Sequence, residues 1–246
     1  MTASLEKKMR AMERGGCISA KALSVVLAGV KPGITTLELN NLAEKTIVSL
    51  GGTPSFKTVK GYNFATCINT NEGIVHGLPG AYELKRGDLI SIDLGTYFAG
   101  FHTDTSHTVE VETKTHDRFL SVGKAALDAG ILCCLIGGRI GDISNAIQDN
   151  VEHAGYSVSR DLVGHGVGKK LHEYPHVPGY GKKGQGEVIR VGMTLAIEVI
   201  YQAGKPEICV EKDGWTLKTA DGSISGLFEH TVAVTKGGPK VLTRCI

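Results

Sequence analysis

Two glutamates lie inside segments that otherwise read as buried β-strands. Glu198 lies in the run Thr-Leu-Ala-Ile-Glu-Val, and Glu229 lies in the run Leu-Phe-Glu-His-Thr-Val. A carboxylate in such a run is costly to bury unless it is paired or coordinated. Either glutamate alone is compatible with an edge strand that is exposed to water. A chain with several such residues must adopt a fold that pairs them, neutralises them or keeps them in solvent.

Two aspartates lie in a predicted hairpin between residues 88 and 110. If the hairpin turns between Phe98 and Ala99, residues whose numbers sum to 197 lie opposite each other, and Asp93 faces Asp104. Like charges in opposed positions of an antiparallel pair are destabilising. Such a pair needs a shared proton, a nearby base or a bound cation. The alternative is that the turn lies elsewhere and that both aspartates are solvated.

A helical pattern occurs twice in the chain, at a separation of 104 residues. Apolar residues at helical spacing end at Gly51 and again at Gly155. Thr35 and Glu38 form a capping box for the first of these helices, and Asp142 is a candidate cap for the second. Chance agreement between two amphipathic helices is the alternative. The apolar positions are Leu39, Leu42, Ala43, Ile47 and Leu50 in the first helix, and Ile143, Ala146, Ile147, Val151 and Ala154 in the second.

Each of these helices follows another helical stretch and precedes segments that are rich in β-formers. The earlier helical stretches span roughly 4–30 and 116–135, and the predicted strands are 89–94, 105–111, 193–201, 207–210 and 227–234. Runs of helices followed by runs of antiparallel strands favour an α+β fold. We expect the helices to cover one face of a sheet and to leave the other face free for a site.

Composition and charge exclude several classes of protein. A net charge of +2 gives no electrostatic footprint for DNA. The first residues lack the apolar core of a signal peptide, and no apolar stretch approaches the ~18 residues that a membrane span needs. The six cysteines are scattered without a C-x-x-C motif, and we expect reduced thiols. The sequence therefore predicts a cytoplasmic protein that binds neither DNA nor a membrane.

A histidine completes a donor set for metal ions. His165 lies in Gly-His-Gly-Val-Gly, where the backbone can approach a ligand closely, although a lone histidine in such a turn is more often structural. Four acidic residues in β-rich segments and one imidazole suit divalent ions such as Mn²⁺, Fe²⁺, Co²⁺ or Zn²⁺. Four carboxylates carry too much negative charge for one ion and suit two, with some carboxylates bridging.

These residues, in their sequence contexts, resemble the type I methionine aminopeptidases of the "pita-bread" metallopeptidase superfamily. The similarity extends from about Glu6 to Leu242 and includes the runs Val-His-Gly-Leu-Pro at 75–79 and His-Glu-Tyr-Pro at 172–175. The 33 residues from His165 to Glu198 favour type I, because type II enzymes have a long insertion there. The contexts are Ser-Ile-Asp-Leu-Gly, Phe-His-Thr-Asp-Thr, Gly-His-Gly-Val-Gly, Ala-Ile-Glu and Phe-Glu-His-Thr.

The resemblance implies a fold and a function. The fold would be the α+β pita-bread fold, in which a pseudo-two-fold antiparallel sheet carries helices on its outer face. Residues 1–246 would form a single catalytic domain with two similar halves, about 4–112 and 113–246. The protein would be a monomeric metalloaminopeptidase that removes the N-terminal methionine from peptides and newly made proteins by metal-activated water attack. The ribosome surface is a further expected partner.

The resemblance also implies roles for individual residues. Asp93 would ligate one divalent ion, His165 and Glu198 the other, and Asp104 and Glu229 would bridge two ions of Co, Mn, Fe or Zn. Glu198 would also take the proton of the attacking water and return it to the leaving amine. The remaining predicted site residues contact the substrate, with core packing as the alternative for the aromatic side chains. They are His76 and His172 beside the scissile peptide, and Tyr62, Phe64, Cys67 and Trp215 around the methionine side chain.

Several positions depart from the family pattern. Gly95 replaces a common threonine, Val199 replaces a proline, Leu171 replaces an aromatic residue, and the segment 61–67 is short. Gly95 and Val199 favour an alternative activity, that of an X-Pro dipeptidase-like aminopeptidase. A second alternative is a catalytically inactive module that binds peptides or the ribosome, but such a module has no need for four converging carboxylates.

Overall fold

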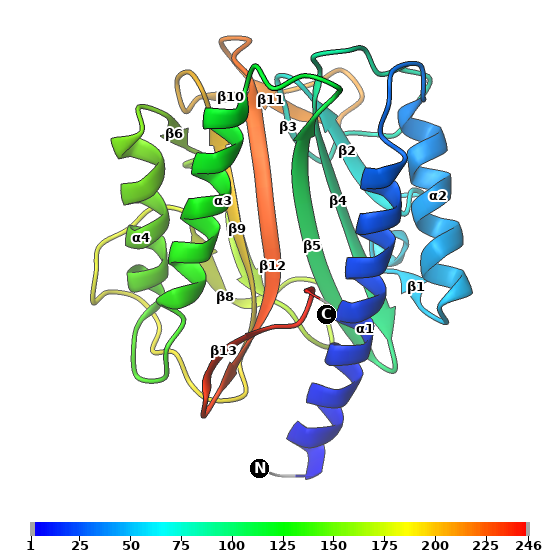
Figure 1. Cartoon of the computed structure of the whole chain (residues 1–246). Helices are drawn as coiled ribbons and strands as arrows, with labels where there is room; N and C mark the ends of the chain where they lie inside the picture. The colour runs from blue at the N-terminus through cyan, green and yellow to red at the C-terminus, as the bar shows by residue number, and fades with distance from the viewer. Residues whose placement is uncertain (1–2, 245–246) are drawn as a thin grey trace.

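The computed structural model describes residues 3–244, which form one large antiparallel sheet with helices on one face (Figure 1). The α-helices in this range are α1 (Ala3–Ala28), α2 (Thr36–Ser49), α3 (Asp117–Leu132) and α4 (Ile140–His153), and a short 3-10 helix spans Phe56–Thr58. The strands are β1 (Thr53–Pro54), β2 (Thr66–Thr70), β3 (Gly73–Val75), β4 (Leu89–Phe98), β5 (Phe101–Glu110), β6 (Ser157–Val158), β7 (Val163–Gly166), β8 (Glu173–Pro178), β9 (Thr194–Gln202), β10 (Ile208–Val210), β11 (Leu217–Thr219), β12 (Ser225–Thr235) and β13 (Gly238–Val241).

The large sheet has the strand order β1-β4-β5-β12-β9-β7-β8, with β2, β6 and β13 paired at its sides. A smaller sheet has the order β10-β11-β3. In Figure 1, α1 and α2 lie over the part of the large sheet that contains β4 and β5, and α3 and α4 lie over the part that contains β9 and β12. The α+β prediction, with helices on one face of a sheet, is confirmed.

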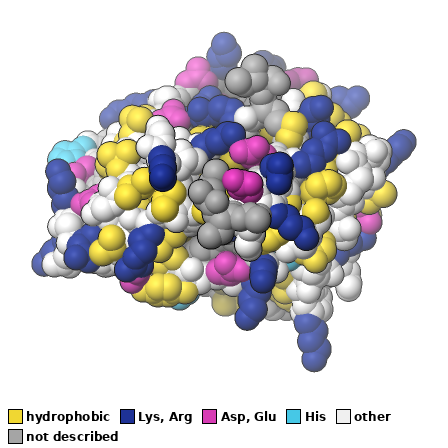
Figure 2. Space-filling model, turned by 90° about the horizontal axis from the view of Figure 1, so that it is seen from below, with side chains coloured by type: hydrophobic (Ala, Val, Ile, Leu, Met, Phe, Trp, Pro, Cys, Tyr) yellow, Lys and Arg dark blue, Asp and Glu magenta, His cyan; other side chains and the backbone are white. Residues whose placement is uncertain are grey.

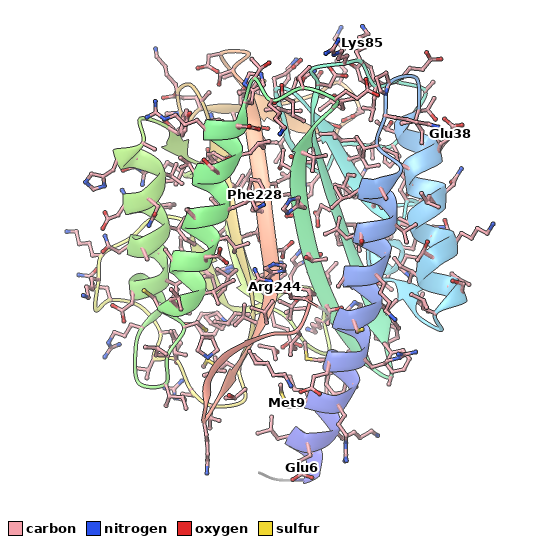
Figure 3. The ribbon with its side chains drawn as sticks, in the orientation of Figure 1. Glu6, Met9, Glu38, Lys85, Phe228 and Arg244 are labelled. Carbon is pink, nitrogen blue, oxygen red and sulfur yellow. The ribbon has the colours of Figure 1, made fainter. Side chains whose placement is uncertain are left out.

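The alternation of side chains along the strands separates the apolar core from the acidic residues. Phe228 of β12 is buried, and its ring occupies the space that a side chain on Gly123 of α3 would fill. Figure 3 shows Phe228 between the strand and the helix. The next residue, Glu229, points to the opposite face because successive side chains alternate along a strand. On β4, Ile92 and Leu94 belong to the core that α1 and α2 cover, and Asp93 lies between them. The acids therefore gather on the face without helices.

The predicted repetition of helices is present in the structure. The bounds of α4 are those of α2 shifted by 104 residues, since 36 becomes 140 and 49 becomes 153. Gly33 and Gly137 both have positive φ values, 84° and 82°, and so do Gly51 and Gly155, at 85° and 89°. In each helix pair, the second helix therefore follows one left-handed glycine and precedes another.

The capping prediction is confirmed for both α2 and α4. The Thr35 N–H donates to the Glu38 carboxylate at 2.8 Å, and the Glu38 N–H donates to Thr35 Oγ1 at 3.1 Å. In α4 the cap position is Arg139, and its N–H donates to the Asp142 carboxylate at 2.8 Å. Asp142 thus occupies the place of Glu38, three residues inside the helix, because Ile140 and Gly141 already form its first turn.

The predicted register of the β4–β5 hairpin is wrong by one residue on each strand. Phe98 pairs with Phe101, so that opposed residues sum to 199, and Asp104 lies opposite Gly95. The reason is a two-residue turn in which Ala99 and Gly100 both have positive φ values, 50° and 92°. Such turns match the twist of the flanking strands. Asp93 and Asp104 are diagonal neighbours on one face of the sheet instead of a direct pair.

Hydroxyl groups reinforce the junction of β5 with β12, where the two parts of the sheet meet. Thr231 Oγ1 accepts a hydrogen bond from the Asp104 N–H and donates one to the Asp104 carbonyl, each at 2.8 Å. The Thr105 hydroxyl donates to the Glu229 carbonyl at 2.9 Å. Both contacts hold the backbone of an acidic residue that was predicted as a ligand. The junction and the predicted site therefore depend on the same hydrogen bonds.

The thiols of Cys67, Cys133, Cys134 and Cys209 are free, whereas Cys17 is disulfide-bonded. The expectation of reduced thiols is wrong at Cys17, since a pair that folding brings together leaves no spacing motif in the sequence. None of the helices between residues 3 and 244 combines the length and the apolar content that crossing a lipid bilayer requires. The face in Figure 2 carries basic side chains interspersed with acidic and apolar ones.

We expect the substitution Thr231→Val to destabilise the protein. Valine keeps the shape of the side chain but leaves the buried N–H and carbonyl of Asp104 without these partners, at a cost of about 2–4 kcal/mol. Urea denaturation measures the free energy of unfolding. The control is Thr46→Val on α2, where the hydroxyl bonds the Leu42 carbonyl within the helix. Equal losses of stability in the two variants would contradict the role of the junction.

Candidate metal centre

The five predicted ligands come from five neighbouring strands of the sheet. In the order of the strands across the sheet, β4 carries Asp93, β5 carries Asp104, β12 carries Glu229, β9 carries Glu198 and β7 carries His165. Each strand contributes one donor, and all five donors lie on the face without helices. The sheet order thus gathers residues that are far apart in the sequence.

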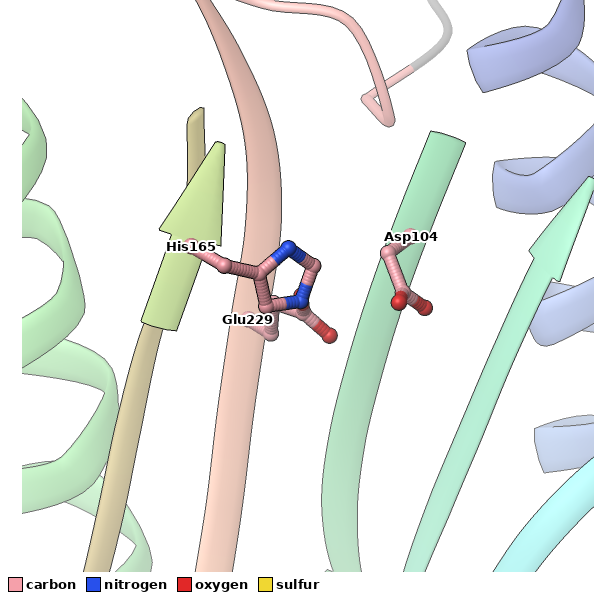
Figure 4. Close-up of side chains that lie close together, drawn as sticks. All are labelled: Asp104, His165 and Glu229. Atoms are coloured by element: carbon pink, nitrogen blue, oxygen red, sulfur yellow. The ribbon is translucent and has the colours of Figure 1, made fainter. Parts of the chain in front are cut away.

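Measured contacts bring these side chains into one cluster. Asp104, His165 and Glu229 each offer a ligand atom within 4.8 Å of the others, and Figure 4 shows them pointing toward one another. His165 Nε2 lies 3.8 Å from a carboxylate oxygen of Glu198. Glu198 and Glu229 occupy directly opposed positions of the β9–β12 pair. Asp93 is a diagonal neighbour of Asp104 on the β4–β5 pair. The structure therefore brings together all five residues that the sequence singled out.

Burial raises the pKa of all four carboxyl groups. The pKa of Asp104 rises to about 7 and that of Glu198 to about 8, in both cases mainly because the groups are removed from water. The pKa values of Asp93 and Glu229 also lie well above their ordinary range, through burial first and the nearby charge of Asp104 second. Without a compensating cation, burial therefore favours the protonated forms of these groups. A divalent cation would displace those protons.

The His165 ring is oriented as a neutral ligand. Its Nδ1 lies 2.9 Å from the Gly166 carbonyl, which can only accept, so Nδ1 carries the proton and Nε2 presents a lone pair to the carboxylates. Burial, followed by the charge of His172, lowers the pKa of His165 to about 4. A neutral imidazole with its second nitrogen anchored is the form that binds metal ions.

The donor set fits divalent metal ions. Asp93 Oδ1 is buried and has no hydrogen-bond partner among the described residues. A buried carboxylate oxygen without a partner is costly, and a cation would satisfy it. Oxygen donors from carboxylates together with one imidazole nitrogen suit Mn²⁺, Fe²⁺, Co²⁺ or Zn²⁺. The cluster is therefore a candidate metal centre on the chemistry of its own side chains.

Glycines around His165 permit close packing of backbones. A Cβ at Gly164 would lie 2.5 Å from the Ala196 carbonyl oxygen, and one at Gly166 would lie 2.6 Å from the Tyr174 carbonyl oxygen. The segment was predicted as a turn in which the backbone approaches a ligand. It is instead strand β7, and its glycines let β8 and β9 approach His165 from both sides.

A cavity of about 370 Å³ opens in front of the cluster. The four acids and His165 line it, and so do the predicted substrate-binding residues His76, His172, Tyr62, Cys67 and Trp215. The His172 ring stacks edge-on against His165, with 4.4 Å between the ring centroids. Phe64 does not line the cavity and packs against Tyr62 from behind, with 5.9 Å between the rings. The structure thus places every predicted site residue at the cavity except Phe64.

Sequence reasoning missed several residues that line this cavity. The 3-10 helix contributes Phe56, β3 contributes Val75 and β9 contributes Ile200. Asp161 and Leu162 come from the segment before β7. All but Asp161 are ordinary apolar residues, so no spacing or composition signal could have identified them.

The departures from the family pattern have local explanations. A Cβ at Gly95 would lie 2.6 Å from the Thr103 carbonyl oxygen and 2.9 Å from Ser55 Cβ, so no larger side chain fits there. Val199 is buried on the helix-covered face, and β9 continues past it to Gln202. Leu171 is buried and lines the cavity.

An antiparallel sheet whose central strands direct four carboxylates and one imidazole into a single cavity defines a metal-dependent hydrolase. This chain belongs to metallopeptidase family M24, whose model matches residues 10–236. It is 42% identical to a methionine aminopeptidase of Clostridium perfringens over 240 residues, covering 97% of this chain and 96% of that protein. It is 40% identical to methionine aminopeptidase 1 of Bacillus subtilis, covering 97% of each.

Solved structures agree with this assignment. The crystal structure of a methionine aminopeptidase from Thermotoga maritima superposes with a TM-score of 0.95 at 40% identity, covering 100% of this chain and 98% of that one. A prolidase from Pyrococcus furiosus has a TM-score of 0.79 at 21% identity, covering 98% of this chain and 65% of that one. The second likeness concerns the fold alone. The predicted pita-bread fold and the resemblance to methionine aminopeptidases are confirmed.

We expect the metal-free protein to lose stability as the pH rises from about 6.5 to about 8. Carboxyl groups whose pKa is raised on folding bind more protons in the folded state, so the free energy of unfolding falls across this range. His165 acts in the opposite direction, but only below its ordinary pKa of 6.5. Thermal unfolding in a chelator, compared with unfolding in Mn²⁺ or Zn²⁺, measures the effect. A metal-free stability that rises across this range would contradict it.

Proposed function

We propose that this protein is a methionine aminopeptidase, which removes the N-terminal methionine from peptides and newly made proteins. The observation that carries the proposal is the cavity, in which a five-donor cluster and an apolar pocket face the same space. Relatives that are 40% and 42% identical over nearly the whole chain are named methionine aminopeptidases. A hydrolytic centre beside an apolar pocket suits a peptide whose first side chain occupies that pocket.

We assign the five donors to two divalent ions, with Asp93 on one ion, His165 and Glu198 on the other, and Asp104 and Glu229 bridging. The number of ions follows from charge, because four buried carboxylates exceed what one divalent ion neutralises. When bound, the ions would lower the pKa of a water molecule toward neutrality and polarise the substrate carbonyl.

Glu198 is the proposed carrier of the water proton. A carboxylate within reach of the attacking water can accept a proton from it and return that proton to the leaving amine. Glu198 lines the cavity at 12% side-chain exposure, within reach of a bound peptide.

His76 and His172 are the proposed hydrogen-bond donors to the substrate backbone. Partial desolvation in the cavity lowers the pKa of both rings, and the charge of His172 lowers that of His76 further. Both rings are therefore neutral at pH 7, and each keeps one N–H. Donors of this kind stabilise the charge that develops on a peptide carbonyl during attack.

The proposed methionine pocket is the apolar end of the cavity. Tyr62 and Trp215 contact each other edge-on, with 5.1 Å between their rings, and the Cys67 thiol is buried beside Tyr62. Burial and the charge of Asp93 raise the pKa of the Cys67 thiol, so it stays protonated. Aromatic rings and sulfur favour a thioether side chain. In this proposal Phe64 supports Tyr62 and does not contact the substrate.

We further propose that residues 1–246 form a single catalytic domain with pseudo-symmetric halves, about 4–112 and 113–246, as the 104-residue shift between helix pairs supports. Newly made proteins as substrates would place the enzyme in the cytoplasm and near the ribosome surface. We propose that it acts as a monomer, because the five donors and the pocket come from one chain.

Peptide hydrolysis tests the activity. We expect cleavage of Met-Ala-Ser after titration with Mn²⁺, Fe²⁺, Co²⁺ or Zn²⁺, and no cleavage of an Ala-Pro peptide under the same conditions. Liberated amino acids are measured by chromatography. Cleavage of Ala-Pro alone would instead support the dipeptidase-like activity. Inactivity on both peptides with every metal would favour a binding module.

The substitution Asp104→Asn tests the shared role of this carboxylate. We expect loss of at least about 100-fold in kcat and weaker metal retention after dialysis, with the circular dichroism spectrum unchanged. The amide keeps the shape of the side chain but removes the charge that two ions would share. Asp149→Asn on the exposed face of α4 is the matched control. Parental activity in Asp104→Asn would exclude the dinuclear assignment.

A further inference from the structure

His76 holds a backbone conformation that few residues with a side chain adopt. Its φ is +59°, in the left-handed region that is disfavoured for residues with a side chain. Such conformations persist where surrounding contacts over-determine them, and they gather at functional sites. The contacts that fix the backbone at His76 therefore also set the direction in which its ring enters the cavity.

The next residue, Gly77, is held against β2 through both of its backbone polar groups. Its N–H donates to Asn69 Oδ1 at 2.8 Å, and its carbonyl accepts from the Ile68 N–H at 2.9 Å. The Tyr62 hydroxyl approaches the same carbonyl at 3.4 Å. A Cβ at Gly77 would lie 2.2 Å from the Ile68 carbonyl oxygen, so the segment has no room to shift toward β2.

We propose that Asn69 is a positioning residue for His76, and that its amide oxygen holds the Gly77 N–H and thereby fixes the His76 ring in the cavity. Asn69 is absent from the described residues that line this cavity, so it acts through the backbone of its neighbour. The proposal rests on the proposed function of His76.

Asn69 is well placed for this role. Its side chain is buried, with 2% exposure, and water therefore does not compete for the hydrogen bond. Asn69 pairs with Ser91 of β4, and Cys67, two residues earlier on β2, pairs with Asp93. The strand that carries Asp93 and the segment that carries His76 are thus both hydrogen-bonded to β2.

The amide oxygen, and not the amide nitrogen, carries this contact. Asn69 Nδ2 is buried without a hydrogen-bond partner among the described residues. A carboxyl group has the same shape, and because burial favours its protonated form, its carbonyl oxygen can accept from the Gly77 N–H without adding a buried charge. The substitution Asn69→Asp is consequently a conservative rescue, and Asn69→Ala removes the acceptor.

Steady-state kinetics with the metal-loaded full chain and Met-Ala-Ser measure the effect. We expect Asn69→Ala to lower kcat by about 10- to 100-fold, because misplacing a group near the reacting bond has effects of this size. KM should change by less than about threefold, and Asn69→Asp should keep most of kcat. The control Ser144→Ala removes a buried hydrogen bond to the Ile140 carbonyl in α4, far from the cavity.

A double-mutant cycle separates positioning from general destabilisation. In a His76→Ala background, Asn69→Ala should lower kcat/KM by less than about twofold, because the ring that Asn69 positions is missing. The same fold loss in both backgrounds would overturn the proposal. If the parent protein does not cleave the peptide, the proposed function fails, and a readout independent of activity is then required.

Nuclear magnetic resonance of the histidine rings in the zinc-loaded protein provides that readout. The His76 ring is identified by its loss in His76→Ala. Because Asn69 holds the segment that carries this ring, release of the segment in Asn69→Ala should shift the ring resonances of His76. The His76 resonances of Asn69→Asp should match those of the parent. Unchanged His76 ring resonances in Asn69→Ala would overturn the proposal.

Discussion

The burial of four carboxyl groups on one face of a single sheet is the constraint on which the rest of this structure depends. Such burial is costly, and each group compensates by holding a proton or, as we propose, by sharing divalent cations. The opposite face of the same strands supplies the apolar core beneath the four helices. Because side chains alternate along each strand, the acidic and the apolar environments lie on opposite faces of one sheet. The helices cover only the apolar face.

The junction between β5 and β12 connects the strands that α1 and α2 cover with the strands that α3 and α4 cover. Asp104 and Glu229 lie on either side of it, and threonine hydroxyls hold the backbone of both residues. Hydroxyl groups suit this place because they pair with main-chain groups without adding charge beside four carboxylates. The sheet is thus continuous across the junction at the point where the predicted bridging ligands must keep a fixed separation.

Much of this arrangement could be predicted from local sequence patterns, and the remainder depends on contacts that no local pattern records. The helices, the long strands and the five donors carry periodicity or unusual residue types. The predicted Asp93–Asp104 register was wrong because Ala99 adopts a positive φ, which an alanine in the sequence does not indicate. Asp142 was identified as a cap of α4, but Arg139 at the N-cap position was not, because it contributes only its backbone N–H. Phe56 was missed because, in the sequence, an apolar residue that lines a cavity cannot be distinguished from one in the core.

The five donors are spread along the chain from residue 93 to residue 229. As the polypeptide emerges during its own synthesis, Asp93 and Asp104 appear early, while Glu198 and Glu229 appear only near the end. An incomplete chain therefore displays two neighbouring aspartates and nothing else with which to retain a cation firmly. Acquisition of metal would be one of the last events of biogenesis. An enzyme built in this way would stay inactive until its own C-terminal strands had joined the sheet.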